Sequence, residues 1–345
     1  MSTQMLLLIL LCSIGNVPTA SSERQLLAGY WGQNSAGPKM GPVNYEKKLK
    51  EVCQTTKYDI LNVAFLYNVF DSRNKDSLPA LDLAHHCTKE ISEEYKFLLQ
   101  CPEIEEGIKE CQKLGKKVLI SIGGPTGDGT LRSPPKAREF AQTLYDLFLG
   151  GNRLIGLRPF GSADMDGVNL DIQGGRPDHY PDFIRKLRRL MDASKKSYLI
   201  TASPQCPYPD NFLRNALKKA WKYVDYVFVQ FYNNDCHIGN LPKFREALDK
   251  WLSFAQANVR PLIFVGLPAH ESASADPKYY TPPSELQVTY EKLKTRTSIG
   301  GIMLWDVSWD QNNIIDGRRY SDHVFALLNG TSILRPTTKP SPGQD

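Results

Sequence analysis

Short apolar runs recur along the chain at spacings of roughly 30 to 50 residues, and each is followed by a segment with helical periodicity. The apolar runs predict strands at 26–31, 60–66, 117–123, 167–173, 198–203, 226–232, 262–267 and 299–305. The periodic segments predict helices near 45–54, 104–114, 137–149, 180–193, 211–219, 243–256, 284–296 and 320–328. Pro102, Pro181 and Pro209 stand where three of these helices are expected to begin, because Pro is tolerated in the first helical turn.

Strand–helix units repeated eight times in about 310 residues predict an α/β protein built as a single (β/α)8 TIM barrel. A doubly wound open sheet is the alternative, but no Gly-x-Gly-x-x-Gly follows the first predicted strand. We find no boundary within residues 23–332 and assign them to one domain.

The first residues resemble an export signal. An apolar run at 5–12 is too short to span a bilayer and is followed by small residues. We therefore predict a signal peptide at 1–22 and a secreted, extracellular protein that does not associate with a membrane. Residues 333–345 are Pro-rich and predict a disordered tail. Asn329-Gly330-Thr331 is a sequon at which an exported protein could be glycosylated on Asn329.

The cysteines support an oxidising compartment. Cys12 falls within the predicted signal peptide, and an even number remains, which favours disulfide bonds but leaves their pairing open. The remaining cysteines are Cys53, Cys87, Cys101, Cys111, Cys206 and Cys236. A zinc site is the rival interpretation, but the chain has no Cys-x-x-Cys pair and no His cluster, so we expect neither a metal nor a cofactor.

The formal net charge of +5 is mild, and the basic residues are spread along the chain. Basic runs at 47–50 and 185–189 fall in predicted helices, where charged residues usually form a solvated face. We therefore expect no nucleic-acid partner.

Polar and aromatic residues gather where the predicted strands end. In the strand at 167–173, apolar residues alternate with Asn169, Asp171 and Gln173, so these three side chains share one face. In a barrel, chemistry lies at the C-terminal ends of the strands. Aromatic rings and amides at one rim suit a sugar, which needs flat faces for its C–H surface and polar groups for its hydroxyls. The substrate-binding residues expected there are Tyr30, Phe65, Gly124, Gln205, Gln230, Tyr232, Asn233 and Trp305.

Motifs on six of the eight predicted strands, in order, resemble the plant-type (class III) branch of glycoside hydrolase family 18, the chitinases. They are Tyr-Trp-Gly-Gln-Asn from Tyr30, Ser-x-Gly-Gly from Ser121, the acidic motif from Asp166, Pro-Gln-Cys-Pro-x-Pro-Asp from Pro204, Val-Gln-Phe-Tyr-Asn-Asn from Val229 and Gly-Gly-Ile-Met-Leu-Trp from Gly300. The resemblance covers about residues 27–328.

The resemblance implies the disulfides Cys53–Cys111, Cys87–Cys101 and Cys206–Cys236, and cis peptide bonds at Ala64–Phe65 and Trp305–Asp306. It also implies that Trp305 floors the subsite where a sugar would be cleaved. Tyr232 would hold the N-acetyl group, with Asp171 beside it.

The acidic motif departs from the family pattern Asp-x-x-Asp-x-Asp-x-Glu. Asp166 and Asp171 match the first and third acids, whereas Asn169 replaces the second and Gln173 replaces the Glu that acts as general acid. An amide cannot supply the proton that a departing sugar oxygen needs. Active members use the substrate's own N-acetyl oxygen as nucleophile, so Asp171 could still orient that group. Asp166, at the start of the strand, is expected to bond to a neighbouring loop. We expect near-complete loss of chitinase activity.

Three hypotheses about function follow. The favoured one is a secreted chitinase-like protein that binds chitin or N-acetylglucosamine oligosaccharides in a barrel-top cleft without hydrolysing them. The second is an inhibitor, storage or extracellular matrix protein that acts through its outer loops, because branch members without the acid include seed proteins resembling concanavalin B and inhibitors of foreign xylanases. The third is a weak chitinase that cleaves β-1,4 N-acetylglucosamine links by substrate-assisted catalysis.

Overall fold

The computed structural model describes residues 24–258 and 260–331, so the predicted signal peptide (1–22) and tail (333–345) lie outside the described residues. Within the described residues, eight parallel strands close into a barrel in the order β1-β9-β8-β7-β6-β5-β4-β2, with β2 pairing back onto β1. The prediction of a single TIM barrel is confirmed. The strands are β1 (Leu26–Trp31), β2 (Ile60–Asn68), β4 (Lys117–Gly124), β5 (Gly167–Ile172), β6 (Leu199–Ala202), β7 (Tyr226–Gln230), β8 (Leu262–Pro268) and β9 (Ile299–Trp305).

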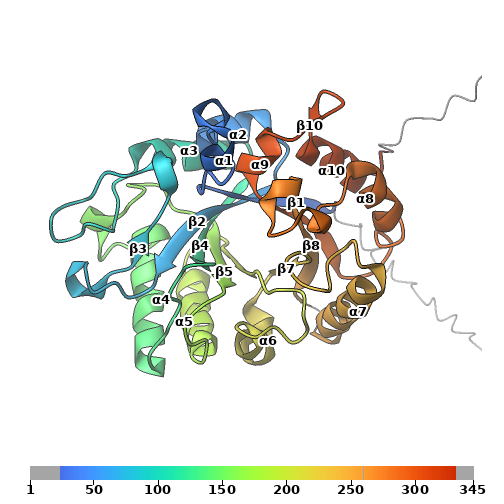
Figure 1. Cartoon of the computed structure of the whole chain (residues 1–345). Coiled ribbons are helices and arrows are strands. Elements are labelled where there is room, and N and C mark those ends of the chain that lie inside the picture. The colour runs from blue at the N-terminus through green and yellow to red at the C-terminus, as the bar shows by residue number, and fades with distance from the viewer. Residues whose placement is uncertain (1–23, 259, 332–345) are drawn as a thin grey trace, which may run out of the picture.

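Helices surround the barrel, as Figure 1 shows. The main helices follow the predicted order and are α2 (Leu49–Thr55), α3 (Pro102–Lys113), α4 (Pro134–Phe148), α5 (Tyr180–Asp192), α6 (Arg214–Ala220), α7 (Leu241–Asn258), α8 (Pro283–Tyr290) and α10 (Tyr320–Leu328). Short elements that the sequence did not predict are α1 (Gly37–Met40), α9 (Val307–Gln311), the two-residue strand β3 (Ala80–Leu81), which pairs antiparallel with β2, and the hairpin of β10 (Ile314–Ile315) and β11 (Arg318–Arg319).

Three helix predictions need correction. The helix expected from residue 45 begins at Leu49. The Glu46 backbone N–H donates to the Asn34 side chain, and the Glu46 carboxylate accepts from the backbone N–H groups of Gly32 and Asn34. These bonds hold the segment around Glu46 in a loop. Pro209 does not start a helix: it follows a cis peptide bond, and α6 begins at Arg214. The helix expected at 284–296 ends at Tyr290, and the residues after it form turns.

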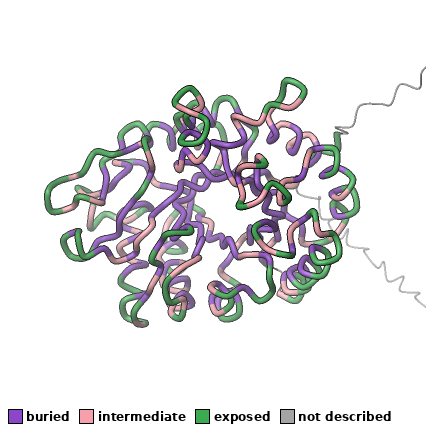
Figure 2. Tube along the Cα trace, viewed as in Figure 1, coloured by how far each residue is buried: buried purple, intermediate pink, exposed green. Residues whose placement is uncertain are grey.

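Two apolar cores position the site. The larger core lies between the barrel and the helices and takes Val168, Leu170 and Ile172 from β5. The smaller core fills the inside of the barrel and includes Tyr30, Phe65 and other residues of several strands. Buried segments accordingly run along the strands and exposed segments lie at the periphery (Figure 2). Because successive strand residues face opposite sides, the polar residues of β5 point into the barrel.

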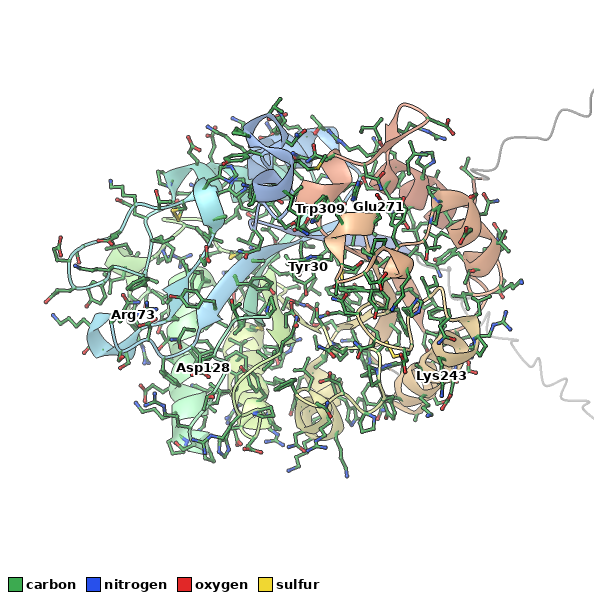
Figure 3. All side chains as sticks on the ribbon, viewed as in Figure 1. Tyr30, Arg73, Asp128, Lys243, Glu271 and Trp309 are labelled. Atoms are coloured by element: carbon green, nitrogen blue, oxygen red, sulfur yellow. A yellow bond between two sulfur atoms is a disulfide. The ribbon has the colours of Figure 1, made fainter. Side chains whose placement is uncertain are left out.

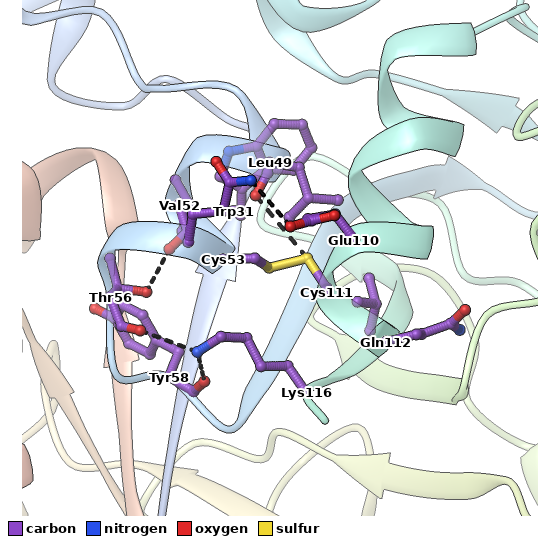
Figure 4. Close-up of a disulfide and its surroundings, with 12 residues drawn as sticks. Trp31, Leu49, Val52, Cys53, Thr56, Tyr58, Glu110, Cys111, Gln112 and Lys116 are labelled. Atoms are coloured by element: carbon purple, nitrogen blue, oxygen red, sulfur yellow. Dashed lines mark hydrogen bonds between the residues drawn. A yellow bond between two sulfur atoms is a disulfide. The ribbon is translucent and has the colours of Figure 1, made fainter. Parts of the chain in front are cut away.

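The disulfides have the pairings implied by the family resemblance: Cys53–Cys111, Cys87–Cys101 and Cys206–Cys236. Figure 4 shows the first, which joins α2 to α3 next to Lys116, whose Nζ donates to the Thr56 and Tyr58 carbonyls. The expected cis bonds at Ala64–Phe65 and Trp305–Asp306 are also present. Among the described residues, no helix has both the length and the apolar character required to cross a membrane.

Candidate functional site

The polar residues of β5 are brought together inside the barrel and at its C-terminal end. Asn169 is fully buried, Asp171 is 2% exposed, and Gln173, which follows the strand, is half-buried. The strand therefore presents an amide in the interior, a carboxyl above it and a second amide nearest the solvent. In Figure 3, Tyr30 is labelled near the middle of the barrel, and its hydroxyl contacts Asn169.

Asn169 is the centre of a buried hydrogen-bond network. Its Oδ1 accepts from the Tyr30 hydroxyl at 2.9 Å and from Ser121 Oγ at 2.8 Å. Its Nδ2 donates to Thr201 Oγ1 and Ser203 Oγ, both at 2.9 Å. Ser203 Oγ also lies 2.6 Å from the Tyr30 hydroxyl oxygen. The Ser203 hydroxyl can therefore donate to Tyr30 while the Tyr30 hydroxyl donates to Asn169. Every polar atom of the Asn169 side chain is thus paired, and all four partners are hydroxyls.

Asp171 is held by two amides. Its Oδ1 accepts from Gln173 Nε2 at 2.8 Å and from Gln230 Nε2 at 2.9 Å, and Gln230 also donates to the Ser203 carbonyl at 2.9 Å. Burial raises the pKa of the Asp171 carboxyl to about 7, although the bonds from Gln173 and Gln230 act to lower it. The carboxyl therefore changes charge near neutral pH, and its orientation is fixed from two strands.

Glycines at the end of β4 let the strands approach one another beside Asp171. Gly123 has φ of +103°, and a Cβ there would lie 2.4 Å from the Asp171 carbonyl oxygen. Gly124 has φ of +80°, and a Cβ there would lie 2.8 Å from the Phe65 ring. The loop that follows also meets the loop after Gln173, since a Cβ on Gly174 would lie 2.6 Å from the Gly127 carbonyl oxygen. The surroundings of Gln173 are therefore shaped by both loops.

Aromatic rings form a wall next to these polar groups. The half-buried Trp305 ring lies with its centroid 6.0 Å from that of Phe65 at an interplanar angle of 19°, and 5.2 Å from that of Tyr30 at 61°. Phe65 and Tyr30 are themselves buried, and the Tyr30 hydroxyl is used by Asn169. Of the three rings, Trp305 is thus the one with surface left for a ligand.

Tyr232 lies close to the acids. Burial raises the pKa of the Tyr232 hydroxyl far above the usual range, and the neighbouring carboxyls of Asp171 and Asp306 add to this effect. The tyrosine therefore stays protonated and can donate a hydrogen bond.

The remaining predicted residues occupy different places. Gln205 is half-buried, and its Oε1 accepts from Asn234 Nδ2 at 3.3 Å. The Asn233 side chain accepts from the Ala275 backbone N–H at 2.9 Å, so it ties the end of β7 to the loop after β8. Asp166 lies at the opposite end of β5 from Gln173, where it accepts from Gln112 Nε2 and the Val118 N–H at 3.0 Å each. The structure does not bring Asp166 to the rim.

A pair of buried acids, Asp306 and Glu46, was not identified from sequence. Asp306 accepts from the Ser35 hydroxyl and the Trp309 N–H, and Glu46 contacts His86 Nε2 at 2.9 Å. Burial, with repulsion between the two carboxyls, raises the pKa of Asp306, and burial raises that of Glu46. Both acids are buried.

The hydroxyl shell of Asn169 was also missed. Ser121 and Thr201 lie directly beside Asn169 in the strand register, and Ser203 follows β6. The Ser-x-Gly-Gly motif pointed to Ser121, but its partner depends on the register, which the sequence does not give. Among the described residues, no cluster of three or more His, Cys, Asp or Glu side chains could hold a metal ion.

Sequence relatives support the chitinase resemblance. The chain is 35% identical over 328 residues to an endochitinase of Saccharomyces cerevisiae, covering 93% of this chain and 54% of the yeast protein. It is 33% identical over 318 residues to an acidic endochitinase of Arabidopsis thaliana, covering 92% of this chain and 94% of that protein. The chain thus spans about half the length of the yeast relative and nearly all of the plant one.

Solved structures agree. A chitinase from Ipomoea carnea has a TM-score of 0.72 at 30% identity, covering 88% of this chain and 99% of that chain. A xylanase–α-amylase inhibitor protein in complex with trehalose has a TM-score of 0.70 at 31% identity, covering 89% and 98%. Concanavalin B has a TM-score of 0.67 at 30% identity, covering 87% and 98%. The sequence profile described as Glycosyl hydrolases family 18 matches residues 26–278, and this chain therefore belongs to that family.

Proposed function

We propose that this protein is a secreted chitinase-like protein that binds chitin or N-acetylglucosamine oligomers and does not hydrolyse them. The observation that carries the proposal is the amide of Gln173 at the acid position, with its Nε2 donating to Asp171 Oδ1. An amide bound in this way can donate a hydrogen bond, but its N–H is far too weak an acid to transfer a proton to a leaving oxygen.

Asp171 is a poor replacement for the missing acid. Its side chain is 2% exposed and lies below Gln173, and two amide donors hold its Oδ1. A general acid must come within hydrogen-bond reach of the oxygen that it protonates. Asp171 is better suited to accept from an acetamide N–H, which would orient the sugar without cleaving it.

Groups that bind a sugar in its ground state are kept. Trp305 offers a partly exposed ring for stacking, Tyr232 a protonated hydroxyl, and Asp171 an oriented carboxyl. Removing an acid takes away transition-state stabilisation and spares these contacts, which is the combination expected of a binding protein. The neighbour crystallised with trehalose adds a family precedent for a sugar complex.

Export is part of the proposal. Three disulfides fit an oxidising compartment and agree with the predicted signal peptide. Glycosylation at Asn329 belongs to the same proposal, since this residue is exposed at the end of α10.

An inhibitor of foreign enzymes is the second candidate. It is favoured by the likeness to the xylanase–α-amylase inhibitor protein, with a TM-score of 0.70. Such a protein would act through its outer loops and would not need the groups at the barrel end.

Binding and turnover can be tested together with chitin beads and soluble oligomers. We expect the protein to be depleted from solution by the beads and to release no soluble sugar from them. No depletion would leave the inhibitor, storage or matrix hypothesis. If the wild type releases sugar and Gln173→Ala does not, the Gln173 amide takes part in hydrolysis. If Gln173→Ala still releases sugar, another residue acts as the general acid.

A further inference from the structure

A pocket lies on the outside of the barrel, between α6 and α7. Its volume is about 620 Å³. Aromatic rings contribute much of its lining, from Tyr208, Trp221, Trp251 and Phe254. Figure 1 shows α6 and α7 as neighbours in the ring of helices, well away from the centre of the barrel. None of Gln173, Asp171, Tyr232 and Trp305 lines this pocket.

The apolar side of the pocket is preformed. Trp251 is 1% exposed, and its Nε1–H donates to the Cys206 carbonyl at 3.0 Å. The Tyr208 ring packs edge-on against Trp251, with centroids 4.9 Å apart at an interplanar angle of 85°. The Cys206–Cys236 disulfide fixes the loop that carries Tyr208. A ring or short chain entering the pocket would therefore meet a surface that needs little rearrangement.

The other side of the pocket is cationic. Arg214 and Lys218 both line it, and they are four residues apart on α6, so they project from the same face of the helix. Both side chains are exposed, and neither forms an ion pair within residues 24–258 and 260–331. The one acid in the lining, Asp210, is buried and already accepts backbone N–H groups of Gln205, Phe212 and Leu213. Two cations thus face a ring-lined pocket whose only carboxyl is turned into its own loop.

We propose that this pocket binds a small amphipathic anion, an apolar ring or short chain that carries a carboxylate or sulfonate. The apolar body would pack on Trp221, Phe254 and Tyr208, and the anionic group would lie beside Arg214 and Lys218. A neutral apolar ligand would gain the packing without the charge contacts. A free inorganic anion would gain only exposed charge contacts, which are weak. The site is separate from the proposed sugar site and does not depend on it.

The probe is 8-anilinonaphthalene-1-sulfonate, with neutral N-phenyl-1-naphthylamine as its uncharged counterpart, both followed by fluorescence on the full folded chain. We expect one saturable site for the sulfonate. The double variant Arg214→Gln/Lys218→Gln should weaken sulfonate binding roughly five- to tenfold and leave the neutral probe unchanged. Trp221→Ala should weaken the binding of both probes, because it removes an apolar wall.

The matched control is Lys186→Gln/Arg189→Gln, which removes the same charge from α5 outside the pocket. We expect it to leave sulfonate binding unchanged. The proposal is overturned if the sulfonate does not bind saturably, if both double variants weaken it equally, or if neither does. It is also overturned if an N-acetylglucosamine tetramer displaces the probe, since the probe would then lie in the barrel.

Discussion

Replacing Asn169 by Ala tests the buried network directly. The side chain forms four hydrogen bonds, to Tyr30, Ser121, Thr201 and Ser203. After its removal, Tyr30 and Ser203 can still bond to each other across 2.6 Å. Ser121 is left with the Tyr30 hydroxyl, which Ser203 already uses, and Thr201 keeps only a long contact of 3.4 Å to the Val168 carbonyl. Two poorly satisfied buried hydroxyls, at about 1–2 kcal/mol each, predict a loss of about 2–4 kcal/mol in the free energy of unfolding.

The assay is urea unfolding followed by tryptophan fluorescence, at fixed pH. Asn211→Ala is the matched control, because Asn211 is exposed, and its effect should stay within about 0.5 kcal/mol. A loss for Asn169→Ala no larger than that of the control would refute the argument that this network is well satisfied and stabilising.

Asn169→Asp refines the same test. All four partners are hydroxyls that can rotate to donate, so a carboxylate at this position would find donors. Complete burial and the neighbouring Asp171 carboxyl would raise the pKa of the new carboxyl above its unfolded value, although bonds donated by the hydroxyls act to lower it. Its contribution to stability is then greatest at low pH and is lost as pH rises through the folded pKa. The variant should therefore fall further behind the wild type with rising pH, and a gap that narrows would contradict this account.

Three more expectations follow. Trp305→Ala should weaken calorimetric binding of an N-acetylglucosamine tetramer about tenfold and more than Asn169→Ala does, because it removes a stacking surface; the reverse ranking would count against stacking. Asn169→Asp with Gln173→Glu should hydrolyse chitin oligomers faster than Gln173→Glu alone, because the second carboxyl tunes the pKa of the restored acid; a folded but inert double variant would mean that the loop around Gly124 and Gly127 also blocks the substrate. Burial raises the pKa of Asp171 to about 7 and of Asp310 to about 6, so the folded chain keeps protons that the unfolded chain has released. The stability contributed by the Asp171 proton is present below the unfolded pKa of 3.8 and is lost as pH rises through about 7, so the melting temperature of Asp171→Asn should fall less than that of the wild type as pH rises from about 5 to about 8; an equal fall in both proteins would contradict the assignment.

Much of the fold could be predicted because the barrel repeats one pattern. The limits of β1 and β9 agree with the apolar runs at 26–31 and 299–305. The missed elements are short: β3, β10 and β11 have two residues each, too few to show an alternation. The late start of α2 has a different cause, because contacts between Glu46 and the Gly32–Asn34 segment override the helical pattern.

The site was predicted less completely. Alternation in β5 was enough to place Asn169, Asp171 and Gln173 on one face. Their partners come from other strands, and strand register decides which residues meet, so Thr201 and Ser203 could not be assigned to Asn169 beforehand. The role of Gln230 as a clamp on Asp171 depends on the same geometry.

Native mass spectrometry of the protein with an N-acetylglucosamine tetramer tests the central claim most directly, since one spectrum shows both occupancy and the mass of the bound sugar. The account predicts a complex with the intact tetramer that persists on prolonged incubation, because Trp305, Tyr232 and Asp171 can bind it and Gln173 cannot protonate it. Complexes that hold shorter sugars, or no complex at millimolar tetramer, would contradict it.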